Sequence, residues 1–454
     1  MKCEEVRDEL IAYLKGELDE DRRNQIDEHL ARCAGCRREL EISQRVLHQT
    51  QAANDTSVIT LVNTIIKDAI DAKATDIHID PTREGAEVRI RIDGVLYPRP
   101  INKWRGESWV ADEVLSPEER DAVVARIKRM AEIPFTESGV PLDGRIPVRM
   151  DGRDYDLRVS IMPVVTGEKI EIRILDKGIP LLGLDNLGFY PEQLELVKNL
   201  LHQPAGMVIS TGPAGSGKTT LLHSMILELT NPSISIVTVE DPVEYLLPGV
   251  QQTQVNWRTG LTFAVAIRTY LRQDPDVIMV GELRDAESTI LAAHAAMTGH
   301  LVLGNMLISD AVSIPQNMVA YGEDPWIVGR SLAGVIACVL VRKVCQDCKE
   351  EYTPSDEALE FLGLKDQVKK TKFYRGTGCD KCRNVGYQGR AQLHEILAID
   401  RELSKMISSG QTDPDALLRQ AVSNGFTTMV EDAKRKVLDG ITTAEEAYRV
   451  LSWR

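Results

Sequence analysis

A glycine-rich segment that begins at residue 212 has the residue types and spacing that suit phosphate binding. It reads GPAGSGKT and fits the pattern G-x4-G-K-[ST], ending in Gly217, Lys218 and Thr219. Glycines let backbone N–H groups turn inward around phosphate oxygens, the lysine reaches the β- and γ-phosphates, and the threonine hydroxyl can ligate Mg²⁺. The candidate ATP-binding residues are Gly212, Pro213, Ala214, Gly215, Ser216, Gly217, Lys218, Thr219 and Thr220.

The elements around this segment support the same interpretation. An apolar run typical of a buried strand, MVISTG at 207–212, precedes it, and a helical run, TLLHSMILEL, follows it. A helix that begins at the loop adds a favourable dipole for an anion. The alternative is a glycine-rich turn that matches the pattern by chance, and the strand–loop–helix order disfavours it.

Two acidic residues stand at the ends of later apolar runs. Glu240 closes the run 235–241 and Glu282 closes the run 276–282. Strand carboxyl ends open onto the ligand crevice of a parallel α/β sheet, where carboxylates can hold magnesium or orient a water molecule. Either acid alone is more typical of a solvated strand end. Two of them behind a P-loop favour a catalytic role.

Six of the eight cysteines form three CxxC pairs, which in a chain without secretion signals indicate metal ligands before disulfides. The pairs Cys345/Cys348 and Cys379/Cys382 predict a closed, structural zinc site with four thiolate ligands. The alternative is a set of four buried free thiols.

The third pair belongs to a different pattern. His29, Cys33 and Cys36 are spaced as on one face of a helix or its end, and Cys3 on the preceding helix can supply a fourth zinc ligand. The alternative is a helical hairpin with incidental cysteines. Cys338 belongs to neither pattern.

The pattern of apolar residues predicts an α/β chain of several parts. Residues 1–50 have helical spacing, and Asp19 is placed to cap the second helix. Alternating strands, with a hairpin turn at Asp93-Gly94, predict an α+β domain, and alternating strands and helices over 190–330 predict a parallel sheet. The expected parts are a helical zinc-binding module at 1–50, a linker at 51–57, an α+β domain at 58–178, a P-loop core at 179–335, and a four-cysteine zinc-binding region with helices at 336–454.

Composition narrows the class of partner and the compartment. The 454 residues carry a formal net charge of −14, which argues against nucleic acid as the main partner. The N-terminus has no apolar signal segment, and the longest apolar run, 332–341, is about half the length of a membrane span. We therefore expect a cytoplasmic protein whose membrane association is peripheral.

Several ordered segments resemble the ATPases of type II secretion and type IV pilus assembly. TVEDPVEY (238–245) resembles their Asp box, LRQDPDVIMVGELRDAES (271–288) their Walker B segment, and TGHLVL (298–303) the start of their His box. TDIHID (75–80), VRIRIDGVL (88–96), LDGRI (142–146) and LRVSIMPVVTGEKIEIRIL (157–175) resemble the domain that precedes their ATPase core. The resemblance covers about residues 58–454 and implies a RecA-like core that uses ATP and Mg²⁺.

The resemblance also implies an assembly and a set of roles. It implies a homo-hexamer in which ATP lies between the two domains of a subunit, near a neighbour's arginines, and drives export or pilus extension through an inner-membrane platform protein. Glu240 would be a base or water-orienting group, Glu282 would serve magnesium, and His300 would sense the γ-phosphate. The candidate arginine fingers are Arg145, Arg158 and Arg173; the alternative for them is a solvated strand face. A four-cysteine zinc site is typical of the assembly and export branch.

The N-terminal segment 3–40 resembles the zinc-binding anti-sigma fold. In that family the module binds a partner protein and sometimes senses redox state. The resemblance implies an unidentified protein partner for residues 1–50.

The chain departs from the ATPase family after TGHLVL. A Ser-Thr-Leu-His-Thr-Asn-like stretch is usual, but residues 304–309 read GNMLIS, so that Leu307 stands in place of the second histidine. Cys338-Val339 replaces a usual Gln-Arg pair. Two hypotheses follow: a working export or pilus ATPase, and a nucleotide-binding, weakly active regulatory or adaptor subunit whose zinc module binds a partner or senses redox state.

Overall fold

The computed structural model describes residues 1–52, 55–99, 101–104, 109–112, 114–134, 139–178, 182–367 and 371–452. The chain divides into two compact units, Met1–Ile179 and Pro180–Arg454. Among the described residues, no helix has both the length and the apolar character that a bilayer span requires. The apolar run 332–341 belongs instead to a strand of the second unit's sheet.

The first unit begins with three helices, α1 (Cys3–Lys15), α2 (Glu20–Arg32) and α3 (Ala34–Ala52). Gly16 ends α1 with a φ of 74°, and the Asp19 side chain accepts a hydrogen bond from the Arg22 N–H, which confirms its predicted capping role. Val6, Leu10, Ile26 and Leu30 share a small core with the buried Cys36. Residues 1–50 are therefore helical, as the spacing of apolar residues predicts.

The predicted linker is largely helical. α3 continues to Ala52, and α4 (Thr56–Asp71) begins after Asp55, whose side chain accepts from the Ser57 N–H. Residues 53–54 of the predicted linker lie outside the described part of the chain. The polar composition of residues 51–57 predicts a linker, but glutamine and alanine favour helix even where the apolar periodicity is weak.

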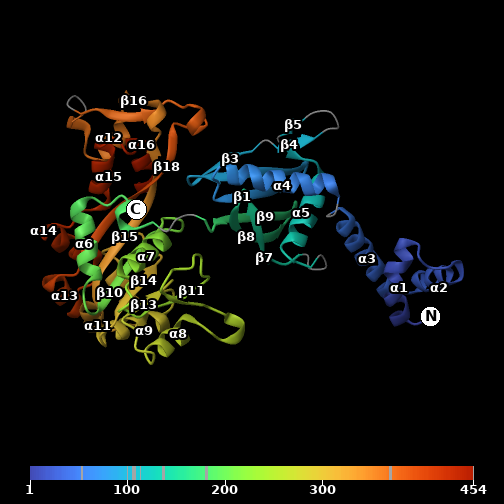
Figure 1. Ribbon diagram of the computed structural model, residues 1–454, viewed down its shortest axis with the longest axis horizontal. Coiled ribbons are helices and arrows are strands. Elements are labelled where there is room, and N and C mark those ends of the chain that lie inside the picture. Colours follow the sequence, from blue (N-terminus) through green and yellow to red (C-terminus); the bar gives the residue numbers. More distant parts are fainter. Residues whose placement is uncertain are drawn as a thin grey trace. The chain divides into compact units, whose positions relative to one another are not determined.

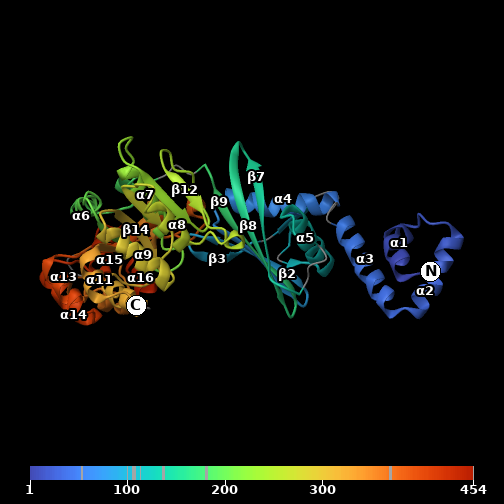
Figure 2. The ribbon, with the colours of Figure 1, turned by 90° about the horizontal axis from the view of Figure 1, so that it is seen from below.

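The rest of the first unit is an antiparallel sheet with helices on it (Figure 1). Its strands follow the order β3-β2-β1-β9-β8-β7, with β6 paired to β2, and α4 and α5 (Pro117–Met130) share its core. The strand bounds are β1 (Asp76–Thr82), β2 (Gly85–Ile92), β3 (Val95–Pro98), β6 (Val114–Leu115), β7 (Leu142–Met150), β8 (Arg153–Val164) and β9 (Gly167–Asp176). A separate pair, β4 (Ile101–Trp104) and β5 (Trp109–Asp112), completes the unit's strands within the described residues. The predicted hairpin at Asp93-Gly94 joins β2 to β3, and β7 and β8 form a long antiparallel pair (Figure 2).

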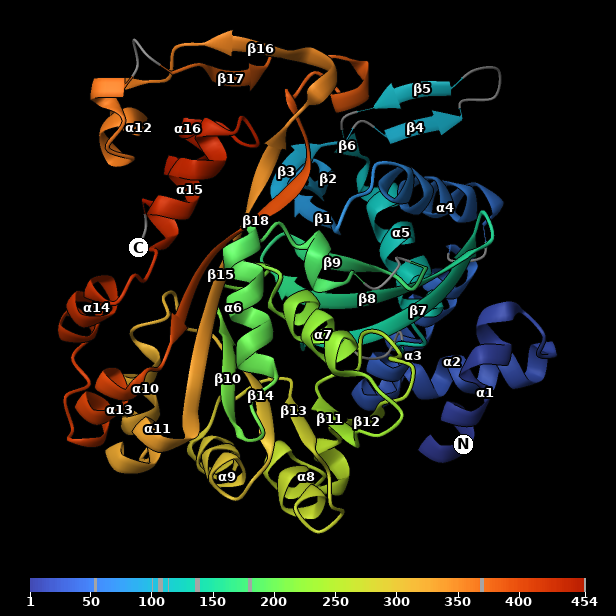
Figure 3. The same ribbon diagram turned by 60° about the vertical axis from the view of Figure 1, so that its left-hand side comes forward.

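The second unit is built on a mainly parallel sheet in the order β12-β11-β13-β14-β10-β15-β18 (Figure 3). β15 pairs in parallel with β10, and only β18 runs antiparallel to its neighbour within the described sheet. The bounds are β10 (Gly206–Thr211), β11 (Ile236–Glu240), β12 (Gln251–Gln254), β13 (Val277–Val280), β14 (Leu301–Met306), β15 (Leu332–Val344) and β18 (Tyr387–Ala398). The boundary expected at 335/336 lies inside β15, so a domain break there would cut through a strand.

Helices cover both faces of this sheet, and their apolar sides form two clusters of buried residues. They are α6 (Pro191–Leu201), α7 (Lys218–Leu229), α8 (Phe263–Tyr270), α9 (Ala286–Met297), α10 (Ile314–Ala320), α11 (Pro325–Ser331), α12 (Asp356–Phe361), α13 (Arg401–Ser408), α14 (Pro414–Ser423), α15 (Met429–Leu438) and α16 (Ala444–Leu451). A small antiparallel pair, β16 (Lys349–Tyr352) and β17 (Phe373–Gly376), lies between β15 and β18 in the sequence.

Candidate functional site

The glycine-rich segment connects the fully buried strand β10 to the start of α7. Gly212, Gly215 and Gly217 have φ values of 142°, 72° and 93°, a backbone region that other residues rarely adopt. An ideal Cβ on Gly212 would lie 2.3 Å from the carbonyl oxygen of Cys338, so this position also needs glycine for space. The loop thus directs backbone N–H groups and the N-terminus of a twelve-residue helix toward one place, as phosphate binding requires.

Lys218 is the first residue of α7 and is mostly buried. Its Nζ donates a hydrogen bond to the Pro213 carbonyl at 2.7 Å, within the same loop. Burial lowers the pKa of Lys218, while Cys338 and, to a smaller extent, Glu282 oppose this shift. The Lys218 ammonium group is therefore held within the loop, away from solvent.

The two predicted acids lie at the same edge of the sheet as the P-loop. Glu240 is the last residue of β11, Glu282 follows the end of β13 by two residues, and both strands run parallel to β14 and β10. The Glu282 side chain is 27 % exposed, with the Arg284 Nε 3.9 Å away. The sheet therefore brings both carboxylates to the edge at which the P-loop begins.

Glu240 is held much more tightly than Glu282. It is buried, and its carboxylate accepts from the Thr238 hydroxyl at 2.7 Å and the Gln252 amide at 2.9 Å, with the His223 Nε2 at 3.1 Å. Burial raises its pKa, but the hydrogen bonds from His223, Gln252 and Thr238 outweigh burial, so the pKa lies below its ordinary value. Glu240 is therefore an ionised carboxylate with a fixed orientation rather than a protonated carboxylic acid.

His300 lies away from the P-loop of its own chain. This residue precedes β14, and its carbonyl accepts from the N–H of Gly206, the first residue of β10. The P-loop follows the last residue of β10, so His300 lies at the opposite edge of the sheet, roughly 20 Å away at the rise of a parallel strand. The structure does not support a contact between His300 and a phosphate held by the P-loop of the same chain.

Leu307, in contrast, lies beside the P-loop. It follows Met306, which pairs with Thr211 at the end of β10, and the residue is 59 % exposed. The Thr211 hydroxyl donates to the Ile308 carbonyl at 2.6 Å, which fixes this segment against the start of the loop. The residue that replaces the usual second histidine is therefore the one with access to the site.

The candidate arginine fingers lie in one cross-strand row of the first unit. The register pairs Arg145 with Arg158, Arg158 with Arg173, Arg173 with Asp76, and Asp76 with Arg91. Because directly opposed residues point to the same face, the structure brings the three predicted arginines together. It also adds Arg91, which the sequence analysis missed.

Carboxylates accompany this row. Arg145 pairs with Asp156, and the Arg173 Nε donates to Asp76 at 3.0 Å. The side chains of Arg145 and Arg173 are still 52 % and 58 % exposed. The row therefore presents guanidinium groups at a solvent-accessible face.

The four C-terminal cysteines converge. Their sulfur atoms lie within 4.8 Å of one another, with separations of 3.9 Å for Cys345–Cys379, 3.8 Å for Cys348–Cys382 and 3.7 Å for Cys379–Cys382. Tetrahedral zinc with Zn–S bonds of 2.3 Å requires S···S separations of about 3.8 Å. Backbone N–H groups of Gly378 and Gly386 point at Cys348 and Cys382, as expected for thiolates. The residues fit a closed, structural zinc site.

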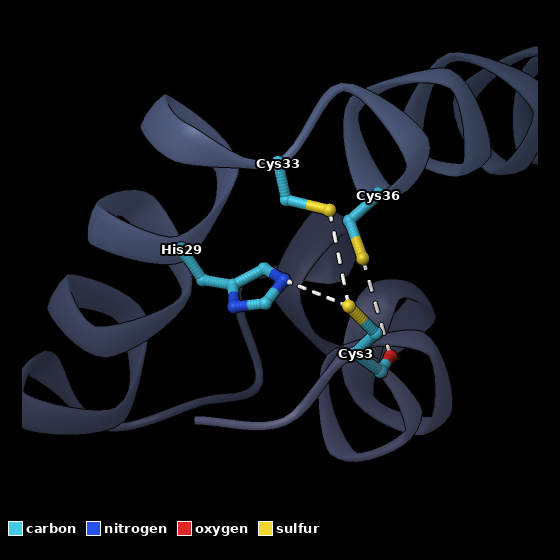
Figure 4. A group of neighbouring side chains, drawn as sticks. All are labelled: Cys3, His29, Cys33 and Cys36. Carbon is cyan, nitrogen blue, oxygen red and sulfur yellow. Dashed lines mark hydrogen bonds between the residues drawn. The ribbon is translucent and has the colours of Figure 1, made fainter.

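The N-terminal cluster joins Cys3, His29, Cys33 and Cys36 from α1, the end of α2 and the start of α3 (Figure 4). The Cys3 Sγ lies 3.8 Å from the Cys33 Sγ and 3.6 Å from the His29 Nε2. The His29 Nδ1 is 3.2 Å from the Met1 carbonyl, the outer contact that usually orients a ligating histidine. This donor set also fits zinc. Among the described residues, these two clusters are the groups of side chains that could hold a metal ion.

Three further groups at the site belong to no motif that the sequence shows. His223 and Gln252 hold Glu240, and Gln392 contacts the P-loop from β18. The Thr238 hydroxyl, which also donates to Glu240, could have been predicted, because residues two apart on a strand have their side chains on one face.

A P-loop at the carboxyl edge of a parallel sheet, with two acids at that edge, defines a P-loop nucleotide hydrolase. The family model "Type II/IV secretion system protein" matches residues 51–449, and a putative zinc-finger model matches residues 3–37. The chain belongs to the type II/IV secretion system protein family, and it is an ATP hydrolase of that family.

Curated relatives agree with this assignment. Type II secretion system protein HxcR of Pseudomonas aeruginosa is 40 % identical over 396 residues, 87 % of this chain and 77 % of that protein. Type II secretion system ATPase E of Vibrio cholerae is 39 % identical, over 88 % of this chain and 76 % of that protein. Type IV pilus assembly ATPase PilB of Thermus thermophilus is 39 % identical over 85 % of this chain, which spans 42 % of that longer protein.

Solved structures share the fold. The ATPase DotB of Legionella pneumophila is similar with a TM-score of 0.62 at 22 % identity, over 86 % of this chain and 95 % of that chain. The pilus retraction motor PilT with bound ADP has a TM-score of 0.55 at 24 % identity, over 85 % and 95 % of the two chains.

Proposed function

We propose that this protein is a homo-hexameric motor that hydrolyses ATP to power type II secretion or type IV pilus assembly at the cytoplasmic face of an inner membrane. The observation that carries the proposal is the convergence of the P-loop, Glu240 and Glu282 at one sheet edge, in a chain whose curated relatives are secretion proteins and pilus assembly ATPases. Work would be delivered through a platform protein of that membrane, which the ATPase contacts peripherally.

The P-loop residues have separate roles in this proposal. Backbone N–H groups of the segment from Gly212 to Thr220, Pro213 excepted, surround the phosphates, Lys218 neutralises their charge, and Thr219 offers a hydroxyl to Mg²⁺. When bound, the metal ion would neutralise charge that develops on the phosphate oxygens. Glu282 suits the magnesium side because it is partly exposed and follows β13 at the sheet edge at which the P-loop begins.

Glu240 suits the orientation of the attacking water molecule. Its low pKa keeps it ionised, and its three hydrogen-bond partners fix the direction of its carboxylate. A carboxylate has about four lone-pair positions, so one can still accept from water. Phosphoryl transfer depends mainly on positioning and charge stabilisation, which a fixed carboxylate provides.

The arginine row would act on the ATP of a neighbouring subunit. Hydrolysis of this type needs a guanidinium group to stabilise charge in the transition state. Arg145 and Arg173 are exposed and belong to the unit that does not contain the P-loop. A hexamer gives such a row access to a second subunit's nucleotide, and Arg91 joins Arg145, Arg158 and Arg173 as a candidate.

The two zinc sites would have different purposes. The four-cysteine site would fix the β16–β17 segment, since four thiolates leave no open position on the metal. The N-terminal module would bind a protein partner, because its three helices form a separate small core around their own metal ligands.

The test of the proposed function is steady-state ATP hydrolysis by the zinc-loaded full chain over a range of protein concentrations. Specific activity should rise with concentration as subunits complete one another's sites, and it should vanish in Lys218→Ala. Vesicles that contain anionic phospholipid should increase the rate if membrane contact supports assembly. A monomer with full, concentration-independent activity would refute the hexameric site.

One observation favours a second function, a regulatory subunit with slow turnover. Leu307 is exposed beside the P-loop, where the family usually has a histidine, and leucine offers neither a donor nor an acceptor. ATP affinity in the usual range together with very slow turnover, even at concentrations where hexamers form, would favour this function.

A further inference from the structure

Strands β15 and β18 lie close to the backbone of the P-loop. An ideal Cβ on Gly217 would lie only 2.3 Å from the Gln392 Nε2 on β18. Gln392 is 4 % exposed, so its amide has no access to solvent that could replace a lost partner. Gln392 is therefore part of the surface on which the loop rests.

The amide of Gln392 donates to the P-loop. Its Nε2 lies 3.1 Å from the Gly217 carbonyl oxygen and 3.4 Å from the Ser216 carbonyl oxygen. Carbonyl oxygens only accept hydrogen bonds, so the amide must present its NH₂ group to the loop and its oxygen to the other side. The same Gly217 carbonyl accepts from the Leu221 N–H and closes the first turn of α7. Gln392 thus holds the peptide groups at the point where the loop becomes the helix.

His394 holds the other end of this amide. Its Nε2 lies 3.2 Å from the Gln392 Oε1, and since that oxygen must accept, the imidazole carries its proton on Nε2. His394 is completely buried and stacks on Phe189 with a centroid distance of 3.8 Å. The imidazole therefore fixes the orientation of the Gln392 amide.

Helix α15 anchors His394 in turn. The His394 backbone N–H donates to Asp432 at 2.9 Å, and Asp432 also accepts from Lys436 at 2.6 Å and from Gln193 of α6 at 2.9 Å. Both α15 and α6 contact β18 (Figure 3). A connected set of buried and half-buried hydrogen bonds thus runs from the P-loop through β18 to α15 and α6 of the same unit.

We propose that Gln392 is a positioning residue for ATP, and that His394 orients it. By holding the Ser216 and Gly217 carbonyls, Gln392 sets the direction of the backbone N–H groups at the start of α7, which face the phosphates. The inference rests on the proposed function of the P-loop as the ATP site. It deepens that function by assigning two residues to nucleotide affinity, of which Gln392 lies 175 positions from Gly217 in the sequence.

The test compares ATP affinity among matched variants of the zinc-loaded full chain by titration calorimetry. Gln392→Met keeps the length and shape of the side chain but removes its donor, and should weaken ATP binding about 3- to 10-fold, the usual effect of one neutral hydrogen bond. Gln392→Glu places a carboxylate against two carbonyl oxygens and should weaken binding further. Gln420→Met makes the same chemical change at a half-buried position of α14, whose amide donates to the Glu402 carboxylate, and should leave affinity unchanged.

His394→Phe separates positioning from mere packing. Phenylalanine keeps the stack on Phe189 but cannot donate to Gln392, so affinity should fall in the same direction as in Gln392→Met. The fold-loss of ATP affinity in the double variant should be smaller than the product of the two single fold-losses, because both substitutions disrupt the same hydrogen-bonded pair. KM should follow the dissociation constant, with a smaller change in kcat. A purely structural role would lower the melting temperature and leave affinity unchanged.

The outcomes separate this inference from the proposed function. ATP binding by Lys218→Ala that equals the unaltered chain would refute the P-loop as the ATP site. If Lys218→Ala loses binding while Gln392→Met and His394→Phe keep it, only the positioning role is overturned. Should Gln392→Met fail to fold, Gln392→Glu and His394→Phe decide the question by the same measurement.

Discussion

The Nε2 of His223 lies 3.1 Å from the Oε2 of Glu240, and both side chains are buried at the carboxyl edge of the parallel sheet. His223 belongs to α7, which begins at Lys218, so this contact links the P-loop helix to the candidate water-orienting acid. Because α7 also carries Lys218, a change in this helix can move the Glu240 carboxylate. A substitution at Glu240 is therefore suited to distinguish ATP binding from ATP hydrolysis.

Glu240→Gln should separate the two. The amide keeps the size of the side chain and removes the charge, so we expect ATP affinity within about threefold of the unaltered chain and turnover at least about a hundredfold lower. Calorimetry and steady-state rates measure the two effects. Glu287→Gln, which neutralises an exposed carboxylate on α9, should change neither. Unchanged turnover in Glu240→Gln would show that the carboxylate is structural.

Zinc content should be about two ions per chain in protein prepared without chelators. Both clusters have sulfur separations that match tetrahedral coordination, and each has a complete set of four donors. Cys36→Ser should remove one zinc ion and Cys348→Ser the other, as measured by elemental analysis, because each replaces one thiolate of a different set. One ion or none in the unaltered, reduced chain would contradict the assignment of both sites.

The sequence predicted the core of the second unit well because its strands are uniformly apolar. The run predicted at 301–306 is β14, and the runs around 207–212, 235–241 and 276–282 contain β10, β11 and β13. Such runs are typical of parallel strands covered on both faces. The P-loop and both acids then followed from the rule that strand carboxyl ends meet at one edge.

The remaining features depend on strand register and long-range contacts, which local patterns do not contain. The motif at His300 and Leu307 spans the whole of β14, and only the register shows which end faces the P-loop. Gln392 and Ser216 meet across 176 positions, and no spacing rule connects residues at that distance. Arg91 was missed because it stands in an ordinary alternating strand, and only the register with Asp76 places it in the arginine row.

Mixing two inactive variants tests whether the arginine row acts between subunits. Lys218→Ala damages the P-loop and Arg173→Ala damages the row, so each variant alone should hydrolyse ATP very slowly. In mixed hexamers some sites combine an intact P-loop with an intact row from the neighbour, and activity should recover to roughly a quarter of the unaltered rate at equal mixing, by random pairing. Arg149→Ala, at the exposed end of β7, is a matched control that should retain activity by itself. If mixing restores nothing although mixed hexamers form, the arginine and the P-loop must act within one chain.

Stability at mildly acidic pH should depend on His394. Its surroundings are the Phe189 ring, the Gln392 amide, the Asp432 carboxylate at its backbone and the Lys436 ammonium group. Burial, with a smaller contribution from Lys436, places the pKa of His394 well below its ordinary 6.5. The unfolded chain therefore binds a proton below pH 6.5 that the folded chain rejects.

This difference lowers the free energy of unfolding as the pH falls, by up to about 1.4 kcal/mol per pH unit below the unfolded pKa. Calorimetric melting of the unaltered chain between pH 7 and pH 5 should show the loss. His394→Phe has no proton to bind in either state, so its melting temperature should fall less over the same range. An identical pH dependence in both proteins would mean that other groups control acid stability.

Leu307 decides between a fast motor and a slow regulatory subunit. A histidine at this exposed position beside the P-loop could donate a hydrogen bond toward the nucleotide or a neighbouring subunit, and leucine cannot. If that contact acts only in the transition state, ATP binding survives while turnover falls. A lost donor in a closed site costs about a hundred- to a thousandfold in rate, and we expect the lower end or less because Lys218 remains.

Leu307→His should then raise turnover at constant ATP affinity, whereas Leu307→Phe, which adds a ring without a donor, should not. Asn305, Ile308 and Ser309 also differ from the usual stretch, so the decisive measurement is turnover beside ATP affinity in the unaltered chain. A rate equal to that of an ordinary secretion ATPase would show that the second histidine is dispensable here and would remove the main support for the regulatory subunit.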